Sequence, residues 1–183
     1  MHRLLFTCLV TSLLMFLGGC AKRAAVSVTR DACSLVSKEE VESVQADAVT
    51  DTKSSERSDD PFRVSQCFYV TAESNKSVNL ALVQERRDQK NNRSPKDFWK
   101  EKFDPYQDEE PKTKDGDEKE QGSAPKKIEG LGEDAYWVSN RFGGILYVLK
   151  GDAFISIGIG GTDDEETKLK KSKALAKKAL QRL

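Results

Sequence analysis

The segment "GILYVLKGDAFISIGIG", residues 144–160, decides the fold class. Two apolar stretches are separated by residues 150–152, Lys-Gly-Asp, which favour a tight turn. In the second stretch Ile155, Ile157 and Ile159 recur at every other position, which is the period of a β-strand. The segment therefore predicts two strands joined by a turn, with an aliphatic face directed at the core.

Two further parts of the chain have the pattern of strands. "VSQCFYV" (64–70) and "SVNLALVQ" (77–84) alternate with period two, and "ESNKS" (73–77) supplies turn residues between them, so we expect a second hairpin. The segment "IEGLGEDAYWVSN" (128–140) leads into the strand pair at 144–160 and predicts one more strand. These segments indicate a largely antiparallel sheet.

Capping signals mark the first and last helices. Ser37 is followed three residues later by Glu40, which forms a capping box and predicts a short helix beginning near residue 38. Thr162 and Glu165 form a second such pair before a C-terminal segment with an apolar stripe, so we expect Thr162 to cap an amphipathic final helix.

A third helix is predicted before a long charged segment. Ser94 and Pro95 are a favoured cap and first helical residue, and the aromatic spacing that follows predicts a helix ending near Asp104. Residues 105–127 are dominated by charge, proline and glycine, and are typical of a solvated loop. The predicted order of helices and strands is that of a single α+β domain over residues 31–183, a mostly antiparallel sheet with packed helices.

The N-terminal segment has the pattern of an export signal. Residues 1–19 begin with a basic residue, continue with an uncharged apolar run from Leu4 to Leu17, and end in two glycines. This run is shorter than the about 20 residues that a membrane span requires. The sequence Leu17–Cys20, "LGGC", closely resembles the lipobox of bacterial lipoproteins.

The lipobox resemblance implies a lipid anchor on Cys20. Cleavage would precede Cys20, its thiol would receive diacylglycerol, its new amino group would be acylated, and residues 20–30 would form a tether. Since Ala21 rather than aspartate follows, the family pattern favours the outer membrane where the organism has two membranes. The alternative is an unmodified cysteine beside an ordinary cleavage site. Cys8 lies too early in the apolar run to accept lipid.

Two cysteines remain for the exported domain. Cys33 and Cys67 would lie in an oxidising compartment, so we expect them to form a disulfide; two free buried thiols are the alternative.

Composition excludes several classes of function. Removal of residues 1–19 takes away His2, the only histidine, and leaves 29 basic residues (30 less Arg3) against 30 acidic ones. A neutral chain lacks the basic footprint of a nucleic-acid-binding protein. Without histidine the chain cannot form a Ser-His-Asp or Cys-His site or a histidine-containing metal site. We expect no catalytic residue, no metal site and no cofactor.

Three other segments have residues that could bind a ligand. The glycine-rich segment 158–162 could cradle a phosphate, but the acidic residues 163–166 that follow disfavour an anion there. The lysines of the last helix could contact anionic lipid or cell-wall polymer, although a basic helix end is also intrinsically stable. Tyr136 and Trp137 could border a groove with Trp99 and Phe103, whereas aromatic residues at such positions more commonly belong to a core.

Three segments of the domain resemble a known group of proteins. "CSLVSKEEVESV" (33–44), "QCFYV" (66–70) and "GLGEDAYW" (130–137) are similar to segments of bacterial lipoproteins of unknown function with a PsbP-like sandwich fold. The resemblance covers about residues 31–183 and implies a sandwich of sheet and helices, with no active site to transfer.

These observations lead to one expectation and two alternatives. We expect a lipid-anchored, palmitoylated envelope lipoprotein, located outside the cytoplasm, that acts as a non-enzymatic binding or accessory module for an envelope protein or cell-wall polymer. The alternatives are an envelope enzyme that uses carboxylates or lysine, and a structural or adhesive surface protein.

Overall fold

The computed structural model describes residues 30–59, 61–86, 93–106 and 124–183. The predicted signal segment 1–19, Cys20, nearly all of the tether and residues 107–123 of the charged loop lie outside the described residues. The elements in chain order are η1 (Ala32–Ser34), α1 (Lys38–Gln45), β1 (Val49–Asp59), β2 (Phe62–Thr71), η2 (Ser74–Lys76), β3 (Val78–Glu85), α2 (Pro95–Phe103), η3 (Asp104–Tyr106), β4 (Lys126–Lys127), β5 (Asp134–Val138), β6 (Ile145–Lys150), β7 (Ala153–Ile159) and α3 (Glu165–Arg182).

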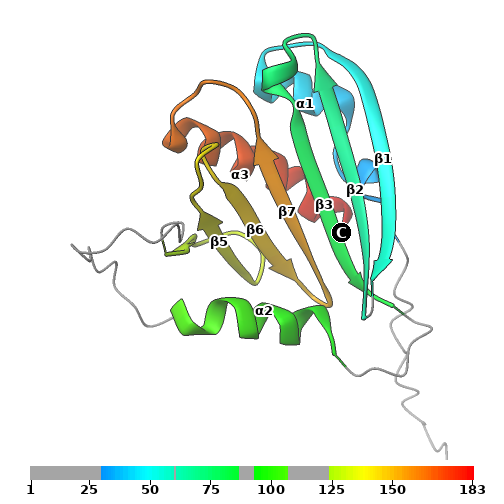
Figure 1. Ribbon diagram of the computed structural model, residues 1–183, viewed down its shortest axis with the longest axis vertical. Coiled ribbons are helices and arrows are strands. Elements are labelled where there is room, and N and C mark those ends of the chain that lie inside the picture. The colour runs from blue at the N-terminus through cyan, green and yellow to red at the C-terminus, as the bar shows by residue number, and fades with distance from the viewer. Residues whose placement is uncertain (1–29, 60, 87–92, 107–123) are drawn as a thin grey trace, which may run out of the picture.

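One seven-stranded sheet forms the centre of the domain (Figure 1). The strand order is β1-β2-β3-β7-β6-β5-β4, and every neighbouring pair is antiparallel. The two predicted hairpins, β2-β3 and β6-β7, lie side by side because β3 pairs with β7. The prediction of a single α+β domain with a mostly antiparallel sheet is confirmed.

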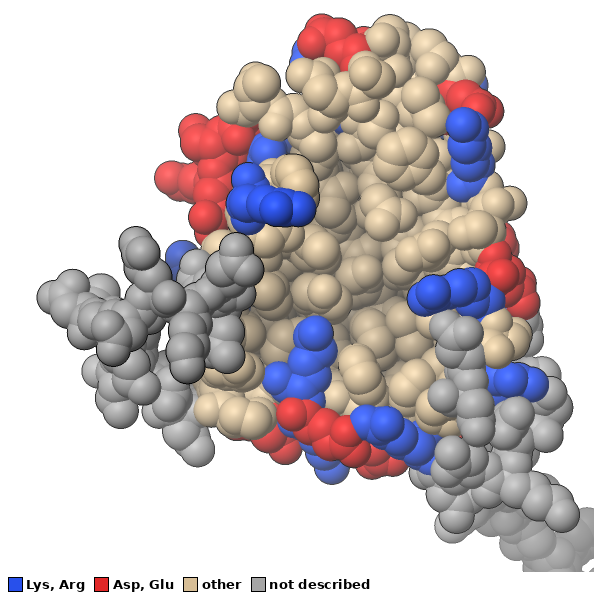
Figure 2. Space-filling view, viewed as in Figure 1, with Lys and Arg blue, Asp and Glu red and all other residues tan. Residues whose placement is uncertain are grey.

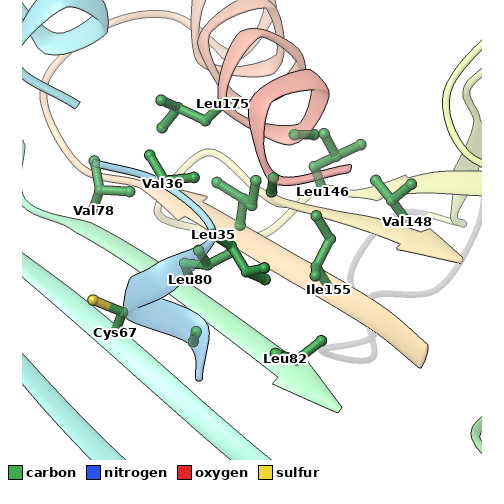
Figure 3. Close-up of a cluster of buried hydrophobic side chains, with 14 of the residues drawn as sticks. Leu35, Val36, Cys67, Val78, Leu80, Leu82, Leu146, Val148, Ile155 and Leu175 are labelled. Atoms are coloured by element: carbon green, nitrogen blue, oxygen red, sulfur yellow. The ribbon is translucent and has the colours of Figure 1, made fainter. Parts of the chain in front are cut away.

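Helices α1 and α3 cover one face of the sheet, and the main core lies between them and the strands (Figure 3). The isoleucines of β7 point into this core, as their alternation predicts, and all are buried. The residues labelled in Figure 3 come from β2, β3, β6, β7, α3 and the segment before α1, and they are Leu35, Val36, Cys67, Val78, Leu80, Leu82, Leu146, Val148, Ile155 and Leu175.

Helix α2 covers only part of the opposite face. It lies across one end of the strands (Figure 1) and buries a second, aromatic cluster. The ring of Phe98 stacks on Phe154 with centroids 5.8 Å apart, and Phe103 stacks on Tyr136 at 4.5 Å. The indole of Trp99 donates a hydrogen bond to the Asp134 carboxylate at 3.0 Å. The sheet thus has helices on both faces, but the second face is covered only where these aromatic residues lie.

The predicted starts of α1 and α2 are confirmed, and that of α3 is corrected. Both expected capping interactions form: the Ser37 hydroxyl accepts from the backbone of Glu40, and the Glu40 carboxylate accepts from the Ser37 N–H at 2.9 Å. The cap of α3 is Asp164, whose carboxylate accepts from the backbone N–H of Thr167 at 2.7 Å. Thr162 lies two residues before this cap, so the helix begins later than the capping-box pattern predicts.

Strand β1 was not predicted from the sequence. Its residues, "VTDTKSSERSD", lack apolar alternation because the strand is at the edge of the sheet and most of its side chains are exposed. Pairing with β2 along nearly its whole length holds it in place.

A buried tyrosine of β2 ties the segment before α1 to the sheet. Tyr69 donates a hydrogen bond to the Val36 carbonyl at 2.6 Å, and burial raises the pKa of Tyr69 to about 12.

The Sγ atoms of Cys33 and Cys67 lie 2.06 Å apart, the distance of a disulfide bond, which agrees with the predicted pairing. The bond joins η1 to the middle of β2. A hydrogen bond from the Ala32 N–H to the Ser65 hydroxyl at 2.9 Å reinforces this contact. The first residues of the described domain are therefore fastened to the sheet.

Candidate functional site

The uncovered part of the second sheet face forms a hollow, which we define by the cross-strand row of Ile145, Gly158, Asn79 and Phe68. Ile145 on β6 pairs with Gly158 on β7, Gly158 pairs with Asn79 on β3, and Asn79 pairs with Phe68 on β2. Paired residues of an antiparallel sheet project from the same face. The row thus has large side chains at its ends and a glycine near its middle, which leaves the sheet concave.

The next row toward α2 has the same shape. Tyr147 pairs with Ser156, and Ser156 pairs with Ala81, so small residues again occupy the central strands. One row farther, Phe154 and Val83 are buried under α2. Helix α2 therefore covers this face of the sheet two rows from Gly158.

A loop from β5 to β6 overhangs the other side of the hollow. Phe142 in this loop is 70% exposed, and Phe68 across the hollow is 41% exposed, which makes them two of the most exposed large apolar side chains of the described residues. The guanidinium of Arg141 lies 4.8 Å from the centre of the Phe142 ring. Isolated exposed apolar residues are ordinary, but two phenylalanines on opposite walls of one concavity are the usual mark of a binding surface.

Figure 2 shows this face of the molecule. Neutral side chains fill its hollowed centre, and charged side chains lie mostly around the rim. The hollow has a volume of about 800 Å³ and opens broadly to solvent. This volume lies within the range of small-molecule sites, roughly 300–1,000 Å³.

One buried cation lies at the wall of the hollow. Lys168, in the first turn of α3, is only 5% exposed, and its ammonium donates a hydrogen bond to the Phe142 carbonyl at 2.8 Å. Its aliphatic stem runs close under Gly143, where a Cβ atom would lie 2.6 Å from Lys168 Cδ. Lys168 thus holds the overhanging loop. Asp163 also lines the hollow, but its carboxylate is paired with the Lys171 ammonium at 2.6 Å.

The aromatic residues predicted from the sequence are in the core rather than at this surface. Tyr136 and Trp137 are adjacent on β5, so their side chains project from opposite faces of the sheet, and both are buried. Trp137 donates to the Glu165 carboxylate at 2.7 Å beside α3, while Tyr136 packs with Trp99 and Phe103 under α2. Burial raises the pKa of Tyr136. Both residues thus belong to the core, which is the more common place for such aromatic residues, and do not border a shared groove.

The basic residues of α3 divide into two groups. Lys168 and Lys171 contact the loops at one end of the helix, and Arg182 forms a two-pronged ion pair with Glu40 of α1, with nitrogen to oxygen distances of 2.7 and 2.9 Å. The exposed side of the helix is lined by Lys170, Lys173 and Lys177 among others. Lys168 and Lys171, two of the six lysines of α3, therefore stabilise the fold rather than form a free basic patch.

The glycine-rich segment after β7 makes internal contacts. The Gly160 N–H donates to the Ser77 carbonyl at 2.9 Å, and the N-terminus of α3 is capped by Asp164. Within the described residues, no three carboxylate, thiol or imidazole side chains gather closely enough to hold a metal ion. Cys20, the predicted lipidation site, is outside those residues.

The residues that shape the hollow were not predicted from the sequence. Gly158 lies inside a mostly apolar strand, and a glycine inside a strand pattern signals a bulge or a close approach of another group. Phe142 is a large apolar residue in a turn with two glycines, "RFGG", which is the other available signal. Lys168 follows the pattern of a surface lysine, and nothing in the sequence marks it as buried.

Across the ranges 30–59, 61–86, 93–106 and 124–183, no helix combines the length and the apolar character needed to cross a bilayer. No protein-family model, curated protein sequence or solved structure matches this chain.

Proposed function

We propose that this chain is a lipid-anchored, non-enzymatic binding module of the bacterial envelope, and that the hollow over Gly158 is its binding surface. The observation that carries the proposal is the concave row of small residues between two exposed phenylalanines, Phe68 and Phe142. Burial of such side chains against a partner is favourable by about 25 cal/mol for each Å² of apolar surface removed from water.

The anchoring part of the proposal is supported by the lipobox and by where the domain begins. The backbone N–H of Arg30 donates to the Gln84 side chain at 3.2 Å. Gln84 is on β3 and pairs with Ala153, the first residue of β7, so Arg30 lies at that end of the two strands. The hollow begins at Asn79, five residues back along β3, or roughly 17 Å at about 3.4 Å per residue. A tether from Cys20 thus joins the domain near the end of the sheet away from the hollow, which leaves the hollow accessible to a partner in the envelope.

The layers of the domain support a finer assignment of the fold. A single antiparallel sheet with α1 and α3 on one face and α2 on the other is a sandwich of the kind implied by the resemblance to lipoproteins with a PsbP-like fold. We propose that relationship on the strength of this layering and the three similar sequence segments.

Metabolic labelling with an alkyne analogue of palmitate tests the anchor. We expect label on the wild-type protein and none on Cys20→Ala, with Cys8→Ala as the matched control that keeps its label. Equal labelling of wild type and Cys20→Ala would refute the anchor.

Site-specific photo-crosslinking in the native membrane tests the binding surface. A photoreactive residue at position 142 should give a crosslinked product that mass spectrometry identifies, and Phe68→Ala should reduce its yield. The same residue at position 177, on the exposed side of α3, is the control. Products of equal yield from both positions, insensitive to Phe68→Ala, would contradict binding in the hollow.

A further inference from the structure

We infer that the hollow binds an anionic lipid through one acyl chain, with the headgroup at Lys168 and Arg141 and the chain along the floor at Gly158. This inference rests on the proposed use of the hollow as a binding surface and names the class of its ligand. It does not depend on the lipid anchor at Cys20.

The first argument is the space above Gly158. A Cβ atom added to this residue would have one neighbour within 4 Å, the Ile145 Cγ1 atom at 4.0 Å, and the backbone of Gly158 is not in the left-handed region. A glycine inside a strand lowers its stability, and here neither steric crowding nor backbone angle requires one. What the glycine provides is room for another group against the sheet.

The second argument is the charge of Lys168. Among the residues that the structure describes, no carboxylate forms an ion pair with this buried ammonium. Its one hydrogen bond goes to the Phe142 carbonyl, and an ammonium group has three donors. A buried charge without a counter-ion is unfavourable, so a carboxylate or phosphate at this wall would be stabilised by charge and hydrogen bonding together.

The surrounding charges favour an anion at that position. Arg141, on the same loop, adds a second cation to the lining of the hollow. Of the described residues that line the hollow only Asp163 is acidic, and its carboxylate is paired with the Lys171 ammonium. The cations are therefore the charged groups left to meet a ligand.

The third argument is the apolar path that leads away from these cations. From the loop with Phe142 the floor passes Ile145 and Gly158 toward Phe68. The neighbouring row of Tyr147, Ser156 and Ala81 continues the same sheet face toward α2. An acyl chain matches a long surface of this kind because its burial needs no directed hydrogen bonds. A peptide strand would instead require an unpaired backbone edge, and the strands that form the floor, β6, β7, β3 and β2, are paired on both sides.

Calorimetric titration with dodecanoate, below its micelle-forming concentration, tests the inference. The full chain with Cys20→Ala is used, so that no acyl group of its own competes. We expect one dodecanoate per chain, and no binding of dodecyltrimethylammonium, which has the same chain and the opposite charge. Acetate, which lacks the chain, should not bind either. Equal binding of the anionic and cationic amphiphiles would overturn the inference.

Three variants locate the ligand. Lys168→Met should weaken dodecanoate binding about 10- to 100-fold, the effect of losing a hydrogen bond to a charged group. Arg141→Gln, at an exposed position, should weaken it by a smaller factor, and Gly158→Leu should abolish it by filling the floor. Lys177→Met is the matched control and should bind as the parent does. If Lys168→Met does not fold, the other two variants decide the question, and unchanged affinity in both would overturn the inference.

The outcome also separates this inference from the proposed function. If dodecanoate does not bind while position 142 crosslinks to another envelope component, the ligand class is wrong and the hollow is still a binding surface. If neither occurs, both proposals are wrong.

Discussion

Replacement of Gly158 by valine should stabilise the protein, whereas replacement of Gly160 by alanine should destabilise it. Both glycines lie at the same end of β7, two residues apart and on the same face. A Cβ atom at Gly158 meets only the Ile145 side chain, at 4.0 Å. A Cβ atom at Gly160 would lie 2.8 Å from the Ser77 carbonyl oxygen and closer still to that of Asn75.

The expected magnitudes follow from these contacts. Glycine lowers the stability of a strand relative to β-branched residues by up to about 1 kcal/mol, so Gly158→Val should raise the free energy of unfolding by about 0.5 to 1 kcal/mol. Both groups near the added Cβ atom are backbone oxygens, and that of Ser77 is hydrogen-bonded to the Gly160 N–H itself, so relief of the clash must move the chain, at a cost of about 1 to 3 kcal/mol. For a domain of this size 1 kcal/mol corresponds to about 2 to 4 °C in Tm.

Thermal unfolding of the oxidised full chain, followed by circular dichroism, measures both effects. We expect Tm to rise by about 1 to 4 °C for Gly158→Val and to fall by about 2 to 12 °C for Gly160→Ala. A fall in Tm for Gly158→Val would show that the space above the strand is not free, and the argument for a binding surface there would lose its main support. An unchanged Tm for Gly160→Ala would show that the β7-α3 connection yields easily.

Three other predictions concern the elements that hold the domain together. Cys33→Ala combined with Cys67→Ala should lower the free energy of unfolding by about 3 to 4 kcal/mol in denaturant titrations, and a reducing agent should then have no further effect. Glu40→Gln keeps the helix cap but loses the ion pair with Arg182, which lowers the pKa of Glu40 from 4.5 to about 2. Above pH 4.5 the wild type should therefore be more stable than the variant, by roughly 1 kcal/mol or less. In a series of Tm measurements this difference should vanish as the pH falls toward 2. Tyr69→Phe should cost about 1 to 2 kcal/mol by the same denaturant assay, because it leaves a buried carbonyl unpaired, and a loss below 0.3 kcal/mol would contradict that assignment.

The sequence predicts elements whose signals are local. The capping box at Ser37, the cap at Ser94 and the alternation in β3 and β7 depend on residues close together in the chain, and the structure has the expected helices and strands there. The final helix shows the limit of such reasoning, because Thr162 and two aspartates compete to cap it. Asp163 is instead paired with Lys171, two turns into the helix, and Asp164 is the cap.

Structural features that depend on pairing between distant segments could not be predicted from local sequence patterns. Strand β1 has no apolar pattern, since its stability comes from pairing with β2 rather than from burial. The hollow depends on the pairing of β3 with β7, which brings Asn79 next to Gly158 although 79 residues separate them. Tyr136 and Trp137 were candidates because they are neighbours in sequence, and neighbours on a strand project in opposite directions.

The bond between Cys33 and Cys67 determines how the domain responds to tension. Cys33 lies three residues after Arg30, so a pull from the N-terminal side reaches the covalent bridge before it reaches α1 or β1. The load then passes into β2, which is hydrogen-bonded to strands on both sides and resists shear along its length. A pull from that end would therefore load β2 through the covalent bridge, while the sheet and the hollow keep their shape.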